Sequence, residues 1–352
     1  MVMRRLHLTI QIDREGSRED APPLCEAIGR TTVLGVFDGL GGAGAVGYQT
    51  PNGTFSGAYL ASRRVRSSVR EWSYEVLRSG EIPPDAGSRL EQRIRKDLNE
   101  YSRSLRPSGS RLRSSMLRTL PTTLTVLAVS EVGRPEPEVG NSADGLPSKV
   151  VCRYFWAGDS RGYLLSPDAG LQQLTRDHLK GSPDAYENLS ADSPLSNCVC
   201  ADRPFRLSEA SVNGRTAAVF LAATDGCFGY LQSPVLFEGL LLDTLADSDS
   251  VGEWQDRLTA EVDRTTGDDA TLSAVGVGFS GFQQMKESFA VRRERVEDRV
   301  GPLRVRQARR DELRSEAEAA EKEYSEALRT SWDEYRKSYE AILPSEGLGG
   351  TS

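Results

Sequence analysis

Val36-Phe37-Asp38-Gly39-Leu40-Gly41-Gly42, or VFDGLGG, follows directly on an apolar run that begins at Thr31. One carboxylate therefore lies at the end of an expected strand, and glycines surround it. Glycine lets the backbone approach another group closely, and a carboxylate with room around it can hold a cation. A tight turn, in which the aspartate hydrogen-bonds its own backbone, is the competing interpretation. The heptapeptide alone leaves both open, so the rest of the chain must decide.

The composition excludes several classes of protein. The 352 residues suit one large domain, or one domain with an appendage. A net charge of −7 argues against nucleic acid as the main partner. The five cysteines are an odd number and are scattered, as expected of reduced thiols in a cytoplasmic protein. No apolar run resembles a signal peptide or a membrane span, and two histidines leave little room for zinc or Ser-His-Asp chemistry.

The order of the expected elements indicates an α+β fold. Helical spacing of apolar residues predicts helices at Ser56–Arg78, Ser88–Leu105, Leu236–Leu245 and Trp254–Val262. Short apolar or β-branched runs predict strands at Leu6–Ile12, Thr31–Phe37, Thr122–Ser130, Val150–Ala157, Gly162–Ser166, Ala217–Thr224 and Thr271–Phe279. Strands and helices are segregated along the chain, which favours a largely antiparallel sheet assembly. The segment Glu131–Ser148, rich in proline and glycine, predicts a mobile hairpin tip.

The amino-acid composition changes near Met285, where Lys, Arg and Glu become dominant. Gly301-Pro302 is expected to divide this region into a short helix and a longer one. Apolar residues of the longer helix recur about every 3.6 residues: Leu313, Ala317, Ala320, Tyr324, Leu328, Trp332, Tyr335, Tyr339 and Ile342. Such a stripe is expected to bury itself against its own domain, a second copy or a partner.

Further acidic residues lie at the ends of other expected strands. They are Glu19 and Asp20 in GSREDA, Asp159 in WAGDSR, Asp225 in LAATDG, and Asp268 and Asp269 in TGDDATL. Buried carboxylates raise one another's pKa, so a cluster of them requires cations. A ligand set of oxygens, without His or Cys, selects Mg²⁺ or Mn²⁺. Each Asp-Gly pair alone is a weak signal, but together and in this order they are specific.

At this point the chain resembles a known family, the metal-dependent protein phosphatases of the type 2C serine/threonine class. The resemblance rests on REDA, VFDGLGG, PTTLTVL, WAGDSRGYLL, LTRDH, LAATDG and GDDATL, in this order. It implies a sandwich of two antiparallel β-sheets flanked by helices, with two metals at one end. We therefore expect a phosphatase-like catalytic domain over residues 1–280, a charged amphipathic helical extension over 281–343, and a disordered tail over 344–352.

The resemblance implies a role for each residue of the central ligand set. Asp38 would bridge two Mg²⁺ or Mn²⁺ ions, and the Gly39 carbonyl would hold one of them. Asp225 and Asp268 would hold the other ion. Asp38, Asp225 and Asp268 are therefore the candidate catalytic residues, since hydrolysis in this family uses water activated between the two metals. No phosphoenzyme is needed, which agrees with the scarcity of histidine.

The resemblance implies supporting roles for the remaining acidic residues. Glu19 and Asp20 would orient metal-bound waters, although for Asp20 support of the ligands is the alternative. Asp159 would belong to a weaker third metal site. Asp269 would buttress the cluster rather than bind metal.

The chain departs from the family pattern at two positions. Leu40 stands where many members have a histidine that is a candidate proton donor, so the general acid is unassigned. Glu15 stands where the family has an arginine that binds phosphate. Arg14 and Arg18 flank that position and are the candidate phosphate-binding residues, with ordinary surface charge as the equal alternative.

The expected function is hydrolysis of phosphoserine and phosphothreonine in proteins phosphorylated by a partner kinase. The segment His178–Asp202 is long and polar, and it is expected to form a flap that selects the protein substrate. The alternative is a catalytically weak, phosphatase-like regulatory or binding module that acts through its C-terminal helix. A third hypothesis is that the chain is an interaction protein, in which the helix from Leu303 to Leu343 is a coiled-coil arm on an incidental domain. Neither nucleic acid nor membrane is an expected partner.

Overall fold

The computed structural model describes residues 5–16, 18–77, 82–108, 117–132, 149–182, 184–189, 193–214 and 217–343. The chain forms two compact units, Met1–Val296 and Glu297–Ser352. Most of the expected hairpin tip, at 133–148, lies outside the described residues, as does the expected tail at 344–352.

The first unit contains two five-stranded sheets. In one sheet the strand order is β1 (Leu6–Ile12), β13 (Ala270–Val277), β12 (Ala218–Ala223), β9 (Arg161–Ser166) and β10 (Gly170–Gln173). In the other it is β11 (Ser208–Gly214), β8 (Lys149–Ala157), β7 (Leu124–Val132), β3 (Thr31–Val36) and β2 (Leu24–Ile28). All these neighbours pair antiparallel, which confirms the expected α+β class.

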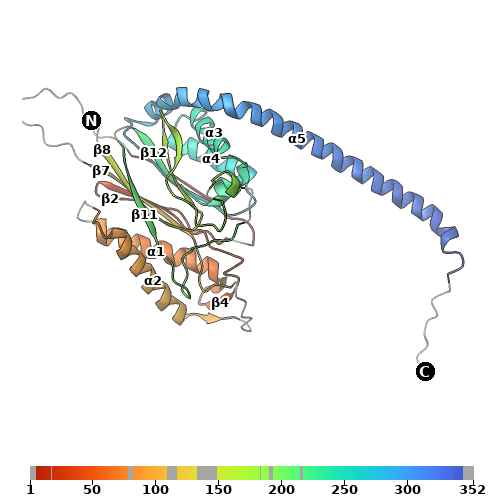
Figure 1. The fold of residues 1–352 in the computed structure, drawn as a ribbon, viewed down its shortest axis with the longest axis horizontal. Helices are drawn as coiled ribbons and strands as arrows, with labels where there is room; N and C mark the ends of the chain where they lie inside the picture. The colour runs from red at the N-terminus through yellow and green to blue at the C-terminus, as the bar shows by residue number, and fades with distance from the viewer. Residues whose placement is uncertain are drawn as a thin grey trace, which may run out of the picture. The chain divides into compact units, whose positions relative to one another are not determined.

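Helices cover both outer faces of the two sheets (Figure 1). On one side lie α1 (Gly57–Leu77) and α2 (Ala86–Ser104), and on the other lie α3 (Pro234–Ala246) and α4 (Val251–Thr265). A small sheet of β5 (Gly53–Ser56), β4 (Gly47–Thr50) and β6 (Arg106–Pro107) precedes and follows the first helix pair. Short 3₁₀ turns occur at η1 (Glu187–Leu189), η2 (Asp225–Cys227) and η3 (Gly229–Leu231).

Core residues are buried between the two sheets and also beneath the helices on their outer faces. Between the sheets, Leu34 and Val129 of one sheet share a cluster with Phe220 and Val275 of the other. Every residue of β3 and β12 is buried, as their continuous apolar runs predict.

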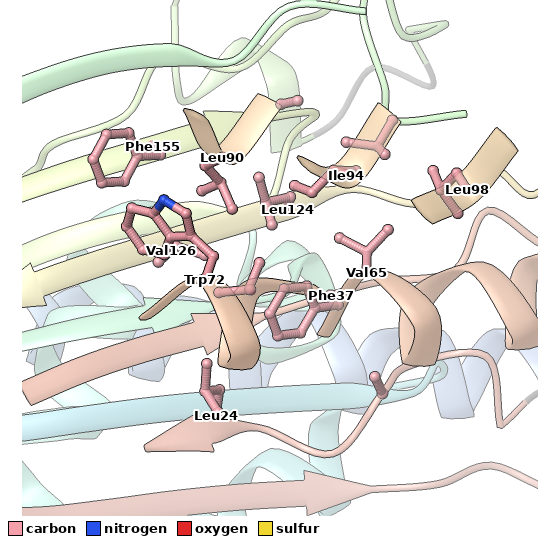
Figure 2. Packing of buried hydrophobic residues seen from close by; sticks show 14 of the residues in the cluster. Leu24, Phe37, Val65, Trp72, Leu90, Ile94, Leu98, Leu124, Val126 and Phe155 are labelled. Carbon is pink, nitrogen blue, oxygen red and sulfur yellow. The ribbon is translucent and has the colours of Figure 1, made fainter. Parts of the chain in front are cut away.

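The second core layer lies beneath the first pair of helices. Trp72 of α1 packs edge to face on Phe155 of β8, with ring centroids 5.6 Å apart (Figure 2). Leu90, Ile94 and Leu98 point from α2 into the same cluster. The apolar spacing that predicted both helices is therefore the spacing of their buried residues.

The helix α5 (Phe282–Tyr339) begins within the first unit. Met285 and Phe289 are buried, and the Arg292 guanidinium makes bonds of 2.7 and 3.0 Å with both carboxylate oxygens of Glu238. Arg293 adds an ion pair of 2.8 Å with Asp243. Residues up to Val296 thus belong to the compact unit, which extends beyond the position 280 given by the family resemblance.

The expected break at Gly301-Pro302 is wrong, because α5 is continuous and contains Pro302. Proline inside a helix loses one backbone hydrogen bond and costs about 3 kcal/mol. Strong helix formers on both sides, chiefly Arg, Glu and Ala, favour continuation across it. Among the described residues, no helix is long and apolar enough to cross a membrane.

Candidate metal centre

The strand register places the predicted acidic residues at one end of the sandwich. Val36 pairs with Thr125, and Leu124 pairs with Ala157, so the chain leaves β3 and β8 at the same edge. In the other sheet Ala223 of β12 lies between Leu272 and Arg161. Asp38, Asp159, Asp225 and Asp268 follow or precede these strand ends, and the topology therefore gathers them.

The loop that carries Asp38 is fastened to the start of β7. The Asp38 carbonyl accepts hydrogen bonds from the Thr123 amide at 2.7 Å and from Thr122 Oγ1 at 2.6 Å. Because Thr122 and Thr123 are fully buried, these bonds are shielded from water. The position of Asp38 is thus set by the neighbouring strand.

The glycines of VFDGLGG allow this loop to contact Glu19. A Cβ on Gly39 would lie 2.6 Å from the Glu19 carbonyl oxygen and 2.7 Å from that of Ala58. A Cβ on Gly41 would overlap Glu19 Oε2. Close packing of the backbone and the Glu19 carboxylate therefore requires glycine at these two positions. The backbone conformation does not require it, because neither Gly39 nor Gly41 has a positive φ.

Burial and mutual repulsion make this acidic cluster, defined as Asp20, Asp38, Asp159, Asp225 and Asp268, unfavourable without cations. Burial first, and then the charges of the other four, raise the pKa of Asp38 well above its usual range. Every member of the cluster thus acts on Asp38.

Three other members of the cluster show the same effect. Burial raises the pKa of Asp20 to about 8, although Thr224 Oγ1 donates to its Oδ2 at 2.9 Å. Burial, followed by the charge of Asp225, raises the pKa of Asp159 to about 7. Burial, followed by the charge of Asp268, raises the pKa of Asp225 to about 6.

The donor set fits hard divalent cations. It consists of oxygen atoms, and Asp159 Oδ1 is buried without a hydrogen-bond partner. In the part of the chain that the structure describes, no three His, Cys, Asp or Glu side chains could hold a metal ion by themselves. Mg²⁺ is commonly held through one or two carboxylates while it keeps several waters, so a partial set of protein ligands is compatible with it.

Glu19 and Asp269 are linked through backbone and hydroxyl groups. Asp269 Oδ2 accepts the Glu19 amide at 2.6 Å, and Oδ1 accepts the Arg14 amide at 2.7 Å. Ser56 Oγ donates to Glu19 Oε1 at 2.8 Å. Both oxygens of Asp269 are therefore used to shape the loop before Glu19. Asp268 is exposed, and its Oδ1 accepts the Asp269 amide at 2.8 Å.

The two arginines predicted to bind phosphate lie in different surroundings. Arg14 Nη2 donates to the carbonyls of Asp263 and Thr266, at 2.6 and 2.7 Å, at the C-terminal end of α4. Arg14 Nη1 also pairs with the Asp263 carboxylate at 2.9 Å. Arg18 is exposed and has a φ of 50°.

One cationic residue near the cluster had no sequence motif to indicate it. Arg63 of α1 stacks over Tyr59, with its Cζ 3.5 Å from the ring centroid, and its Nη1 reaches the Glu19 carbonyl at 3.5 Å. Arg63 follows Tyr59 by four residues, about one helical turn, and this spacing could indicate the stacking of the two side chains. The approach to Glu19 depends on tertiary packing and has no local signal.

The expected flap segment is attached to the site at both of its ends. Near its start, Arg161 and Asp177 form a buried ion pair of 2.7 Å, and Arg161 Nη2 donates to the Ala185 carbonyl at 3.3 Å. Near its end, the amides and carbonyls of Val199 and Thr122 exchange hydrogen bonds of 2.9 and 3.0 Å. Thr122 in turn holds Asp38, so this segment contacts the loop that carries the central carboxylate.

Sequence comparison finds no relative, whereas comparison of structures finds many. No protein-family model matches the chain, and no curated protein matches it. The serine/threonine phosphatase Stp1 of Staphylococcus aureus is 16% identical, with 79% of this chain and 95% of that chain covered and a TM-score of 0.50. A sex-determining protein of C. elegans is 17% identical, with coverages of 82% and 67% and a TM-score of 0.53.

A further match is the catalytic domain of PstP, a serine/threonine phosphatase of Mycobacterium tuberculosis, in complex with two manganese ions. It is 18% identical, with 78% of this chain and 98% of that chain covered and a TM-score of 0.48. At these identities the matches to Stp1 and to the sex-determining protein show the fold alone. The two antiparallel sheets, their helical layers and the match to Stp1 thus show that this chain has the fold of the type 2C serine/threonine phosphatases.

Proposed function

We propose that this protein hydrolyses phosphoserine and phosphothreonine in proteins, with two Mg²⁺ or Mn²⁺ ions as cofactors. The observation that carries the proposal is the convergence of the acidic cluster around Asp38 from strand ends of both sheets. Such a cluster is costly unless cations compensate it. The fold and the order of the motifs support the same assignment.

The residues that would hold the cations are those that the motifs indicate. Asp38, the Gly39 carbonyl, Asp225 and Asp268 would be the main ligands, and Asp159 would serve a third ion. When bound, the two cations supply a water that is acidic enough to react at neutral pH and positive charge beside the phosphoryl oxygens.

The supporting residues act by fixing positions. Asp269 holds the Glu19 amide, and Ser56 holds the Glu19 carboxylate, so Glu19 is oriented before any ligand arrives. Thr224 Oγ1 does the same for Asp20. Preorganised acidic groups of this kind lower the cost of assembling a catalytic site.

No protein nucleophile is required, and the thiol beside the cluster is poorly suited to be one. Cys227 lies two residues after Asp225, and burial raises the pKa of its thiol well above the usual value. Its Sγ donates to the Thr271 carbonyl at 3.4 Å. A thiolate is the reactive form of cysteine, so the structure favours direct attack by water over a phosphocysteine. Leu40 offers no proton to the leaving oxygen.

Metal-dependent turnover tests the proposal. We expect the purified full chain to hydrolyse p-nitrophenyl phosphate and a phosphothreonine peptide with Mn²⁺, to stop with EDTA, and to recover with excess Mn²⁺. The variant Asp38→Asn is the matched control, because it keeps the shape of the side chain and removes its charge. The absence of turnover of both substrates in saturating Mn²⁺ and Mg²⁺ would reject the proposal.

A second candidate role belongs to α5. Its stripe residues Leu313, Tyr324, Leu328, Trp332, Tyr335 and Tyr339 are exposed. Exposed apolar stripes mark interaction surfaces, so we propose that α5 binds a partner or a second copy. This role is compatible with catalysis and would suit a weak phosphatase that acts mainly by binding.

The five unpaired cysteines support a cytoplasmic location, and a partner kinase would supply the substrate.

A further inference from the structure

The proposed reaction needs a positive group for the substrate phosphate, and the motif position for it is acidic. Glu15 is exposed and occupies that place. The neighbouring Arg14 has its guanidinium on the end of α4, where it meets two carbonyls and the Asp263 carboxylate. A basic side chain that could hold the phosphate must therefore lie elsewhere around the acidic residues.

Arg63 reaches this region from α1. Its neighbour Ser62 donates to the Glu19 carbonyl at 2.5 Å, which fixes this turn of the helix against Glu19. The Arg63 side chain runs back along the helix over Tyr59, the direction that long helical side chains prefer. The stacking leaves the edge of the guanidinium available for hydrogen bonds.

Arg63 keeps hydrogen-bond donors unused, whereas Arg66 and Arg70 on the same helix are engaged at short distance. Its Nη1 makes only long contacts, of 3.3 to 3.5 Å. Its Nε and Nη2 donate to no residue that the structure describes. By contrast, Arg66 donates to the Pro22 carbonyl at 2.7 Å, and Arg70 pairs with Glu26 at 2.6 Å.

The charge of Arg63 faces the acidic residues of the site. Burial lowers its pKa, and the carboxylates of Asp13, Asp20 and Asp269 act in the opposite direction. A half-buried guanidinium with free donors carries a desolvation cost that an anionic ligand would offset. Its planar fork matches two oxygens of a phosphate group.

We propose that Arg63 binds the phosphate of the substrate from α1, in place of the arginine that the motif would put at position 15. The inference rests on the proposed function, since it assigns a residue to the same site. Arg63 would hold two phosphoryl oxygens, and Tyr59 would keep the guanidinium oriented. The basic residue that orients the phosphate thus comes from a helix, and the loop before Glu19 is left free to be shaped by Asp269.

The test compares Arg63→Ala and Arg63→Lys with Arg66→Ala, a matched change on the same helix. In saturating Mn²⁺ we expect Arg63→Ala to raise both KM for p-nitrophenyl phosphate and the inhibition constant of inorganic phosphate by roughly tenfold to a hundredfold. Arg63→Lys should recover part of the loss, because lysine keeps the charge without the fork. Arg66→Ala should leave both constants near wild type. Mn²⁺ affinity and Tm should be similar in wild type and both Arg63 variants.

Two results would overturn the inference while the proposed function stands. One is an active Arg63→Ala variant with unchanged KM and unchanged phosphate inhibition. The other is a loss of Tm and Mn²⁺ affinity equal in Arg63→Ala and Arg63→Lys, which would make the residue structural. If wild type itself is inactive, calorimetry that measures the binding of inorganic phosphate to the Mn²⁺-loaded chain tests the anion site directly. Binding that Arg63→Ala loses would uphold the anion site, and binding that is absent or unchanged would reject it.

Discussion

Asp269 accepts the backbone amide of Glu19 at 2.6 Å, which joins the start of β13 to the loop that follows β1. These residues lie far apart in sequence, and the pairing of Ile12 with Ala270 at the end of the β1–β13 ladder brings their segments together. Assembly of the first sheet therefore orients Glu19. The second Asp269 oxygen holds the Arg14 amide, so one carboxylate shapes the whole segment before the acidic pair.

Asp269→Ala should weaken metal binding through this loop. In saturating Mn²⁺ we expect the free energy of unfolding to fall by about 1–3 kcal/mol, since two partly buried amides lose their side-chain acceptor. The Mn²⁺ dissociation constant should rise as Glu19 loses its orientation. Chemical denaturation and calorimetry measure the two effects. Asp269→Asn keeps one acceptor and should be milder, and equal effects of the two variants would contradict this role.

Asp225→Asn should separate activity from stability. Hydrolysis should disappear with the fold retained, because the variant loses a proposed metal ligand. In EDTA at pH 8 the variant should be more stable than wild type by about 1–3 kcal/mol, since Asp225 has a pKa of about 6 against an ordinary 3.8. Thermal unfolding measures this gain. The exposed Asp256→Asn is the control and should change neither property. Near-wild-type turnover of Asp225→Asn would remove it from the metal site.

The metal-free protein should lose stability as pH rises. Asp20 has a pKa of about 8 in the folded chain and about 3.8 as a free side chain. Between these values the folded state binds more protons than the unfolded state, so stability falls with pH, by up to about 1.4 kcal/mol per unit for one group. Urea unfolding in EDTA from pH 5 to pH 8 measures the slope, and Asp20→Asn should flatten it. A stability that rises over this range would contradict the buried cluster.

The sequence predicts elements best where burial imposes a pattern. β1 was predicted with its observed bounds, because apolar residues alternate along it with more polar ones, and Leu8, Ile10 and Ile12 are buried. β11 was missed because SEASVNG is polar, which is natural for a strand at the edge of its sheet. The acidic cluster was predicted because each carboxylate sits in a local motif. Arg63 was not, since only tertiary packing brings it to Glu19. The continuity of α5 through Pro302 was likewise missed, because proline is a strong but not absolute local signal.

The flap segment should control protein substrates and leave small ones unaffected. A short ribbon brackets the stretch 181–193. In it the Lys180 amide donates to the Pro194 carbonyl, and the Ser196 amide donates to the His178 carbonyl. Replacement of this stretch by a short glycine-serine linker keeps the ribbon and the bridge from Val199 to Thr122. We expect kcat/KM for a phosphoprotein to change severalfold, and kcat/KM for p-nitrophenyl phosphate to stay nearly constant. A parallel loss for both substrates would mean that the segment supports the fold.

Truncation of α5 at two points should separate folding from binding. Removal of every residue after Phe279 deletes Met285 and Phe289, which are buried, and the bidentate pair between Arg292 and Glu238. Loss of a buried Met or Phe costs about 2–5 kcal/mol each, so this truncation should unfold or aggregate.

Truncation after Pro302 keeps those contacts and removes the exposed stripe of α5. Burying such side chains against a partner is worth about 1.5–3 kcal/mol each, which favours association through the stripe. We therefore expect the shorter chain to retain its Tm and its turnover of p-nitrophenyl phosphate, and to lose an oligomeric state or a bound partner. Light scattering on both lengths, with Leu328→Glu in the full chain as a point control, measures the difference. If the truncated chain and Leu328→Glu match the full chain in mass at all concentrations, self-association through the stripe is excluded. If truncation after Pro302 destroys turnover or solubility, the distal part of α5 contributes to the catalytic fold, and its proposed role in binding should be dropped.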